Sequence, residues 1–489
     1  MNIKKLIKFI SALLIFTFIM VNILSCNNSE ADNNIEKDNI DAQPPDVTET
    51  EEVLPSFDFD NYEFTILNMI QAEHYYMNMM MEVEGEIGEP INDAAYKRSR
   101  EIEGAFNIKF REINASDTLQ MSKKEFLSGA DTYDLAMLID REAMTLAQQN
   151  LVARIDEMPN IQLDKPWWDQ NAREVFSIGG KLFSLPGGYQ LSNLDLTRFV
   201  LFNKQILADI EGEDLYQLVR DGKWTFDKLI SIAKQNSRDL NGDGIYDEND
   251  AYGLISVAHH LSLGIFFYGS GESFIKKDND DMPYFAMPGN ERAVMVYQKI
   301  VDELYSGNYY FCTQVTKDNE NIATALFSGN HALFYAISLN RIPKFRDMDS
   351  PFGILPPPKF NEAQDRYYCE SGGGLIGVAY AGSENLTRTG AVWDAYSQLS
   401  YKYVVPAYFE VSLKTKFTRD IESENMLDLI YKNLWYDLGN VYWWEDIISK
   451  YNDIFVKKDT NIVSATEKIN DKVDKIISDY ISSFTDTND

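Results

Sequence analysis

Oxygen-bearing side chains recur at a regular spacing in DLNGDGIYDENDAYG, residues 239 to 253. If Asp239 is position 1 of a twelve-residue loop, oxygen donors fall at positions 1, 3, 5, 9 and 12, a glycine falls at 6, and position 7 offers its backbone carbonyl. Calcium, a hard cation, takes about six to eight such oxygens. The spacing therefore predicts an EF-hand calcium loop. Its ligands are Asp239, Asn241, Asp243, Ile245, Asp247 and Asp250.

The loop departs from the EF-hand pattern at its last position. Position 12 is Asp250, whereas glutamate is usual there. Aspartate is one methylene shorter, so we expect a less certain bidentate contact and a lower calcium affinity. The alternative is a series of Asx and glycine turns that binds no metal. We expect the calcium to be structural and to lie away from any binding cleft.

The composition limits the classes of partner. The chain has 489 residues, 45% of them hydrophobic, which favours two or more domains. Its net charge of -31 opposes phosphate, so nucleic acid is an unlikely partner. No histidine pair has zinc-ligand spacing, and no GxSxG nucleophile elbow occurs. Besides Cys26, only Cys312 and Cys369 are present, and either one disulfide or two free thiols fits them.

The first residues indicate export. Lys4, Lys5 and Lys8 precede an almost uncharged apolar run that ends at Leu24, shorter than a comfortable membrane span. The sequence ILSC then resembles a bacterial lipoprotein box, in which Cys26 is lipidated and becomes the new N-terminus. The alternative is an ordinary secretory signal. We expect residues 1–26 to be a signal peptide with its lipidated cysteine, and the protein to be anchored at the outer face of the cell membrane of a Gram-positive-type bacterium.

The composition and hydrophobic pattern of the remaining chain predict an acidic tether followed by an α/β body. Residues 27–56 are rich in acids and lack apolar periodicity, which is typical of a disordered tether. Strand-like runs then alternate with helix-like runs, and helix dominates after residue 391, so we expect largely parallel sheets. The predicted strands begin at Tyr62 and cover 62–69, 133–140, 198–204, 332–337 and 375–381. The predicted helices cover 224–234 and 290–305, and residues 91–110 are expected to form a helix that leads into another strand.

Several stretches in order resemble one family. KPWWDQNAREVFSIGGKLFSLPG, VLFNKQIL, DGKWTFDKLISIAK, ALFSGNHALFYAI and FGILPPPKFNEAQDRYY are similar to segments of the family 1 extracellular solute-binding proteins of bacterial ABC importers, the maltose-binding type. The similarity covers most of residues 60 to 400. A calcium-loop insertion is common in Gram-positive members, and the loop at residues 239–250 looks like one.

The resemblance implies a two-lobed α/β fold of the type II periplasmic-binding-protein kind, with mixed sheets flanked by helices and a hinged cleft between the lobes. Lobe 1 is expected to comprise residues 57–200 and 365–410, and lobe 2 residues 201–364 and 411–489. The chain is expected to cross between the lobes near 195–205, 360–370 and 405–415.

A cleft for sugar needs an aromatic wall and a few placed polar groups. The 7 Trp, 28 Tyr and 28 Phe residues supply rings in excess, although most must be core. The better candidates lie in the stretches PWWD, PGGYQLSN, CESGGGLIG and VYWWED, and for each of them plain packing is the alternative. The candidate ligand-binding residues are Trp168, Tyr189, Gln190, Asn193, Glu370, Trp443 and Trp444.

The resemblance therefore implies a lipid-anchored binding protein that captures a solute, most simply an oligosaccharide, and delivers it to the transmembrane subunits of an ABC permease. We expect no covalent chemistry and contact with the membrane only through the anchor. Two alternatives stay open. One is a surface-anchored glycan-degrading enzyme, and the other is a lipoprotein that senses a ligand or adheres without transport.

Overall fold

The computed structural model describes residues 53–70, 81–313, 317–345, 347–372, 374–409 and 421–485. The chain divides into two units, Met1–Thr48 and Glu49–Asp489, and all the described residues belong to the second unit. The predictions for Cys26 and for most of the tether therefore lie outside the described residues. Within the ranges given above, no helix combines the length and the apolar character needed to span a bilayer.

One group of strands forms a four-stranded sheet in the order β12-β3-β1-β2. These strands are β12 (Leu375–Val378), β3 (Leu135–Ile139), β1 (Tyr62–Met69) and β2 (Ile108–Ala115). β1 runs parallel to β2 and β3, while β12 is antiparallel to β3. β3 is buried along its whole length, as expected of a parallel strand covered on both faces.

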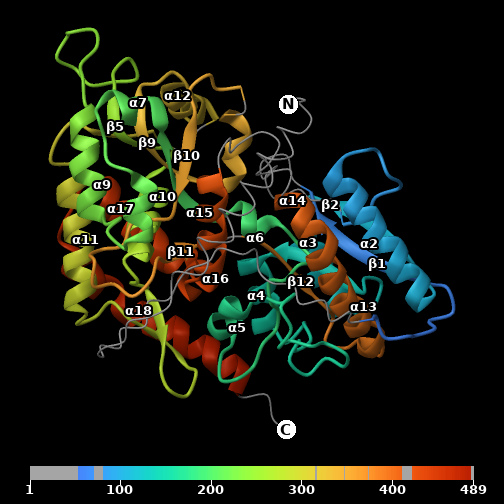
Figure 1. The fold of residues 1–489 in the computed structure, drawn as a ribbon. Helices are drawn as coiled ribbons and strands as arrows, with labels where there is room; N and C mark the ends of the chain where they lie inside the picture. The colour runs from blue at the N-terminus through green and yellow to red at the C-terminus, as the bar shows by residue number, and fades with distance from the viewer. Residues whose placement is uncertain are drawn as a thin grey trace, which may run out of the picture. The chain divides into compact units, whose positions relative to one another are not determined.

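Four helices pack with this sheet, and Figure 1 shows α2 running along β1 and β2. They are α2 (Pro90–Phe106), α3 (Thr118–Ser128), α4 (Asp140–Gln148) and α13 (Leu386–Leu399). Trp393 of α13 lies against Gly377 of β12. The aromatic side chain thus fills the space that the absent Cβ leaves over the strand.

A second, five-stranded sheet has the order β10-β4-β9-β5-β8. Its strands are β10 (Phe352–Leu355), β4 (Arg198–Asn203), β9 (Ala332–Ser338), β5 (Tyr252–Ser256) and β8 (Tyr310–Cys312). β5 is parallel to β8 and β9, and β4 is antiparallel to both of its neighbours. Both sheets are therefore mixed, as the family resemblance implied. The expectation of largely parallel sheets was wrong for the five-stranded sheet, in which antiparallel pairings are as frequent as parallel ones.

The helices around the five-stranded sheet include one that is buried on all sides. α10 (His259–Gly269) is buried from Leu261 to its end, because it contacts the sheet as well as neighbouring helices. α9 (Phe226–Ala233) begins where predicted, with the Thr225 hydroxyl accepting a hydrogen bond from the Lys228 amide. The others are α7 (Lys204–Asp209), α8 (Leu215–Arg220), α11 (Glu291–Leu304), α12 (Lys317–Ser328), α15 (Ile421–Lys432) and α17 (Ser449–Val456). The long helix α18 (Ile462–Thr485) contacts α11 and α17 and also α4, which packs with the four-stranded sheet.

Two small sheets and several short helices complete the described part of the chain. β11 (Cys369–Glu370) pairs in parallel with β13 (Leu434–Trp435), and β6 (Ile275–Lys277) forms a hairpin with β7 (Pro283–Phe285). The short helices are α5 (Gln170–Phe176), α6 (Ser192–Asp195), α14 (Val405–Phe409) and α16 (Leu438–Tyr442).

Two chain segments lie side by side where the chain passes between the sheets. The first is 192–198, which contains α6 and enters β4. The second is 369–375, which leaves β11 and enters β12. The Ser371 hydroxyl donates to the Asn193 carbonyl at 2.5 Å, and the Leu375 amide donates to the Ser192 hydroxyl at 2.8 Å. We call these the crossing segments. The lobe boundaries themselves stay predictions, and the third predicted crossing falls partly on residues 410–420, outside the described ranges.

Candidate ligand-binding site

The edge of the five-stranded sheet that faces the crossing segments is rich in polar side chains. Because β4 is antiparallel to β9, Arg198 at the start of β4 lies opposite Ser338 at the end of β9. In open α/β sheets, ligands bind outside the carboxyl ends of the parallel strands. This edge is therefore the natural place to look for a site, and the crossing segments border it.

A buried ion pair joins the two crossing segments. Arg198 Nε lies 2.8 Å from Glu370 Oε2, and the Glu370 side chain is 1% exposed. Burial raises the pKa of Glu370, and the charge of Arg198 opposes this rise. A Cβ on Gly264 of α10 would lie 1.8 Å from Arg198 Nη1, so only glycine leaves room for the guanidinium there.

The two arginines at this edge are each paired with a carboxylate. Arg341, just beyond β9, lies 2.9 Å from Glu320, which also pairs with Lys344, and Arg198 pairs with Glu370. Burial, with help from both arginines, lowers the pKa of His260 to about 3. His260 is thus neutral at ordinary pH. Because both arginines already have carboxylate partners, this edge suits a neutral guest better than an anion.

Two buried side-chain amides, those of Asn440 and Gln190, use only part of their hydrogen-bonding capacity. Asn440 Nδ2 donates to Glu370 Oε1 at 2.6 Å, but Asn440 Oδ1 has no partner among the described residues. Gln190 Oε1 accepts hydrogen bonds from Ser192 and Asn193, while Gln190 Nε2 has no described partner. Gln190 is 3% exposed and Asn440 is 6% exposed. Buried polar atoms normally find partners, so this donor and this acceptor are candidates for hydrogen bonds to a ligand or water that reaches them.

Asn193 is held by the close approach of the second crossing segment. A Cβ on Gly374 would lie 1.7 Å from Asn193 Oδ1, so the two segments meet at a glycine. The structure thus brings Gln190, Asn193 and Glu370 of the predicted site together, and it adds Arg198 and Asn440 to them.

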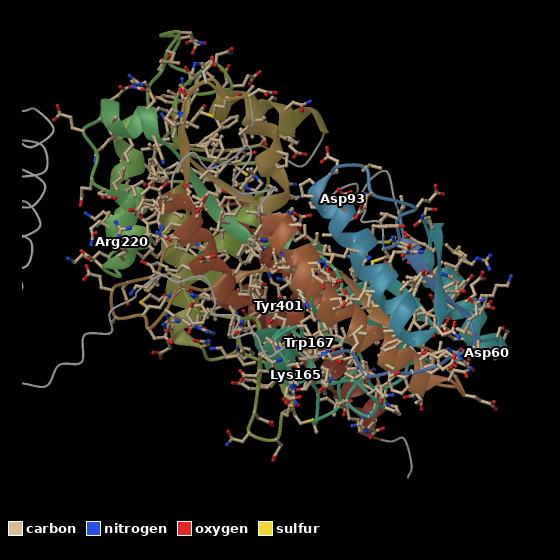
Figure 2. All side chains as sticks on the ribbon, turned by 45° about the vertical axis from the view of Figure 1, so that its right-hand side comes forward. Asp60, Asp93, Lys165, Trp167, Arg220 and Tyr401 are labelled. Carbon is tan, nitrogen blue, oxygen red and sulfur yellow. The ribbon has the colours of Figure 1, made fainter. Side chains whose placement is uncertain are left out.

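The predicted candidate Trp168 lies elsewhere, in the core beside the four-stranded sheet. Trp168 Nε1 and Trp167 Nε1 both donate to Asp394 Oδ1, at 2.9 and 3.1 Å. The Trp168 side chain is 1% exposed and contacts the rings of Tyr189 and Trp393. Figure 2 labels Trp167 beside Lys165, whose ammonium lies 5.9 Å from the Trp167 ring. In this conformation both tryptophans pack and neither offers a free face.

Tyr189 is packed in the same cluster. Its hydroxyl donates to the Leu185 carbonyl at 3.0 Å and accepts from the Gly377 amide at 2.9 Å, and burial raises its pKa. Trp443 is 4% exposed and lies against the rings of Tyr442 and Tyr480. The Tyr189 hydroxyl and the Trp443 ring thus already have partners within this protein.

Helix α16, which precedes Trp443, contacts α4, which follows β3. Tyr480 of α18 also reaches α4, because its hydroxyl donates to the Met144 carbonyl at 3.2 Å. The side chain of Trp444 is outside the described part of the structure. The ligand contacts proposed for Trp168, Tyr189 and Trp443 stay predictions, and in this conformation packing accounts for all three.

The sequence held one signal for Arg198 that could have been used. It is a single cation directly before the apolar run FVLF, at the place where the chain was expected to cross. A buried cation needs a partner, and that requirement points to an acid on the other crossing segment. Nothing in the local sequence marks Asn440.

The predicted calcium loop is closed by its own hydrogen bonds. Asp239 accepts from the amides of Gly242 and Gly244, at 2.6 and 2.8 Å. Asp250 is fully buried and accepts from the amides of Leu240 and Asp247, at 2.9 and 3.0 Å. The hard oxygens fit calcium chemically. As placed, no three Asp, Glu, His or Cys side chains of the described residues form a group able to hold a metal ion.

The two remaining cysteines are free. Cys312 is half-buried at the end of β8, and Cys369 is buried in β11. Burial raises the pKa of both thiols, so they are poor nucleophiles.

Comparison with known proteins adds evidence at the level of the fold. The sequence matched no protein-family model and no curated protein. MalE of Bdellovibrio bacteriovorus, a maltose/maltodextrin-binding domain bound to maltotriose, is 15% identical with a TM-score of 0.50, covering 87% of this chain and 100% of that one. MalE of Listeria monocytogenes, a maltose-binding protein in complex with maltose, is 14% identical with a TM-score of 0.55. The match covers 88% of this chain and 100% of that one. An ABC substrate-binding protein of the same organism, in complex with cycloalternan, is 12% identical with a TM-score of 0.52. That match covers 86% of this chain and 100% of the other.

At such low identities these likenesses concern the fold. All three structures are described as binding proteins or binding domains. Each is matched over its whole length by most of this chain, which confirms the predicted fold class. The chain has the two-lobed α/β fold of the maltose-type ABC solute-binding proteins.

Proposed function

We propose that the protein is a solute-binding protein of an ABC importer and that it holds a neutral oligosaccharide at the crossing segments. The observation that carries the proposal is the shared fold, because the similar structures are binding proteins whose described ligands are maltose, maltotriose and cycloalternan. Binding energy would close the lobes on the ligand, without covalent chemistry.

The chemistry of the site supports a neutral, hydroxyl-rich guest. Sugar hydroxyls both donate and accept hydrogen bonds, and Gln190 Nε2 and Asn440 Oδ1 are one buried donor and one buried acceptor without described partners. The ion pair of Arg198 with Glu370 leaves no net charge beside them. An anionic ligand would have to displace Glu370 from Arg198, and a cationic one would face the guanidinium.

The anchor and the transport partner are part of the same proposal. Lipidation at Cys26 would hold the protein at the outer face of the membrane, and an ABC permease would receive the ligand. The lipoprotein-like sequence ILSC supports the first step. The ABC-transporter context of a similar structure supports the second. Trp444, whose side chain is not described, stays among the candidate ligand contacts.

We also propose that residues 239–250 bind calcium. The support is a set of hard oxygens at EF-hand spacing in a loop whose Asp239 and Asp250 already fold the backbone around them. The exposed carboxylate of Asp243 and the half-buried carboxylate of Asp247 would turn inward on binding. Calcium would cross-link the loop and would take no part in catalysis.

The proposal is tested by thermal unfolding in the presence of a panel of neutral oligosaccharides, with uronic-acid oligosaccharides and peptides as comparison classes. A ligand at about 100 times its Kd stabilises a protein by about 2.7 kcal/mol. We expect at least one neutral oligosaccharide to raise the unfolding temperature. A rise only with peptides or with acidic sugars would contradict the proposed ligand class.

The rival enzyme function is tested with the same sugars. Sugars that stabilise the protein are incubated with it, and the release of reducing ends is measured. Release by the purified protein would favour a glycan-degrading enzyme. Tight binding without release would favour capture.

A further inference from the structure

A surface groove lies between α11 and α18, on elements that the proposed sugar site does not use. The groove encloses about 580 Å³. Its floor includes Met287 and Val294, and its rim includes Met295 and Val463, which are 50% and 47% exposed. Exposed large apolar side chains that line a groove are typical of an interaction surface.

The groove is acidic as well as apolar. Glu291, Glu467 and Asp471 line it, and none of its described lining residues is a lysine or an arginine. None of these three carboxylates pairs with a cation among the described residues. Three unpaired carboxylates around apolar side chains attract a group that is both cationic and apolar.

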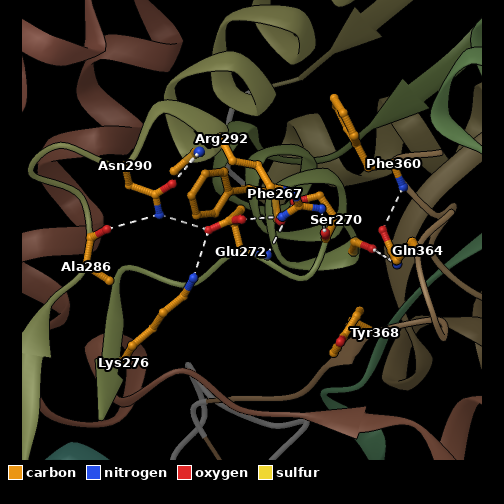
Figure 3. Close-up of polar contacts among 12 residues, drawn as sticks. Phe267, Ser270, Glu272, Lys276, Ala286, Asn290, Arg292, Phe360, Gln364 and Tyr368 are labelled. Carbon is orange, nitrogen blue, oxygen red and sulfur yellow. Dashed lines mark hydrogen bonds and ion pairs between the residues drawn. The ribbon is translucent and has the colours of Figure 1, made fainter. Parts of the chain in front are cut away.

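Arg292, which follows Glu291 in the sequence, and Lys276 are both held by Glu272, as Figure 3 shows. Arg292 pairs with Glu272, and Lys276 lies 3.1 Å from the same carboxylate. Asn290, which also lines the groove, donates to Glu272 at 3.1 Å. Burial would raise the pKa of Glu272, but these donors outweigh it and hold the pKa below its usual value. Glu272 therefore stays charged and keeps Arg292 and Lys276 away from the groove carboxylates.

The other cations of these two helices do not line the groove. Lys299 of α11 pairs with Asp227 at 2.7 Å, and Lys472 of α18 pairs with Asp446 at 2.7 Å, while Lys468 and Lys475 of α18 lie outside its described lining. The negative charge of the groove is thus left for an outside partner. A second copy of this chain is a poor candidate, because its net charge of -31 would bring like charge to the groove.

We propose that the α11–α18 groove docks a basic segment of a partner protein, in which an apolar side chain enters between Met295 and Val463 and flanking lysine or arginine side chains reach Glu467 and Asp471. A protein segment fits better than a small molecule, because small-molecule sites enclose most of their ligand, whereas the rim residues here are half exposed. Methionine adapts to varied apolar partners, which suits such a rim.

The proposal is tested with the full chain and a short labelled peptide in which lysines alternate with leucines, followed by fluorescence anisotropy at about 0.15 M salt. One comparison peptide replaces each lysine by glutamate, and another replaces each leucine by serine. We expect the wild-type protein to bind the first peptide at least about tenfold more tightly than either comparison peptide.

Two charge-reversed variants locate the binding. E467K with D471K alters the groove, and D453K with D479K makes the same change in net charge at exposed positions outside it. We expect the groove variant to bind at least about tenfold more weakly and the control to bind like wild type. Circular dichroism checks that both variants are folded, and if the groove variant is not, V463S with M295S replaces it. Equal weakening in groove variant and control, or no peptide binding by the wild type, would overturn the proposal.

Discussion

At the residue scale, the proposed site depends on two side-chain amides that the protein itself does not fully satisfy. Asn440 bonds to Glu370 of the buried ion pair, and Gln190 bonds to Ser192 and Asn193 of the first crossing segment. Gln190 Nε2 and Asn440 Oδ1 are buried and lack described partners. A buried polar atom that loses water without gaining a partner is unfavourable by about 1–3 kcal/mol. A ligand hydroxyl would relieve this penalty in the closed state, so the amides favour closure only around a suitable guest.

Replacing one amide should therefore weaken ligand binding. We expect Gln190→Ala to lower the affinity for the oligosaccharide by about two- to tenfold, the worth of one hydrogen bond, measured by calorimetric titration. Because Gln190 Oε1 also accepts hydrogen bonds from Ser192 and Asn193, the free energy of unfolding should fall as well, by about 1–3 kcal/mol. Gln217→Ala, at an exposed position on α8, is the matched control. An unchanged affinity in the Gln190 variant would remove this residue from the site.

Asp437 should make stability depend on pH. Its carboxylate is buried and accepts hydrogen bonds from the Phe274 and Gly439 amides, yet burial raises its pKa to about 7. The unfolded chain has the ordinary, lower pKa, so the folded state binds more protons between the two values. Stability is then highest below the unfolded pKa and falls as the pH rises toward 7.

The expected contribution of Asp437 is on the order of 3 kcal/mol between pH 4 and pH 8. Urea unfolding at a series of pH values measures it. Asp437→Asn cannot titrate, so we expect a lower stability overall and a flatter dependence on pH over this range. If wild type and variant have parallel pH profiles, Asp437 is ionised in the folded protein and the assignment is wrong.

At the element scale, the two crossing segments are joined by a charge pair that neither segment could bury alone. Arg198 opens β4, Glu370 lies in β11, and Gly264 of α10 leaves room for the guanidinium. Removing one partner leaves an uncompensated buried charge, which destabilises by about 3–5 kcal/mol, whereas removing both is much less unfavourable.

A double-mutant cycle tests this coupling. We expect Arg198→Leu and Glu370→Leu each to lower the free energy of unfolding by about 3 kcal/mol, and the double variant to recover a large part of the sum. Gly264→Ala should resemble Arg198→Leu, because its Cβ would occupy the guanidinium site. Additive effects of the two leucine substitutions would show that the pair does not hold the segments together.

The acidic loop 239–250 makes a prediction of its own. If calcium cross-links the loop, chelation should lower the unfolding temperature by a few degrees and leave oligosaccharide affinity almost unchanged. D239N with D243N should abolish the response to chelator, whereas D278N with D280N, in the turn between β6 and β7, should not. A large loss of affinity on chelation, at a temperature where the protein stays folded, would contradict a purely structural role.

At the scale of the whole molecule, the sequence alone predicted the elements better than it predicted the site. Strand β1 and helix α11 lie where the hydrophobic pattern placed them, because local periodicity determines such elements. The environment of Trp168 could not be read in this way. Its partner Asp394 is 226 residues away, and only the tertiary fold brings them together.

The same reason separates the residues of the proposed site that the sequence analysis named from those that it did not name. Gln190, Asn193 and Glu370 stand in glycine-containing stretches near the expected crossings, so local composition pointed to them. Asn440 reaches Glu370 from α16, across 70 residues of chain. Contacts of that length depend on how helices dock, which neither propensity nor spacing encodes.

The central claim is that a neutral oligosaccharide binds at the crossing segments. Hydrogen–deuterium exchange with and without the sugar that most raises the unfolding temperature tests it directly. We predict slower exchange in segments 187–198, 369–378 and 437–443, and little change in α11 and α18. Protection confined to surfaces away from the crossing segments, or no protection by a sugar that demonstrably binds, would contradict the claim.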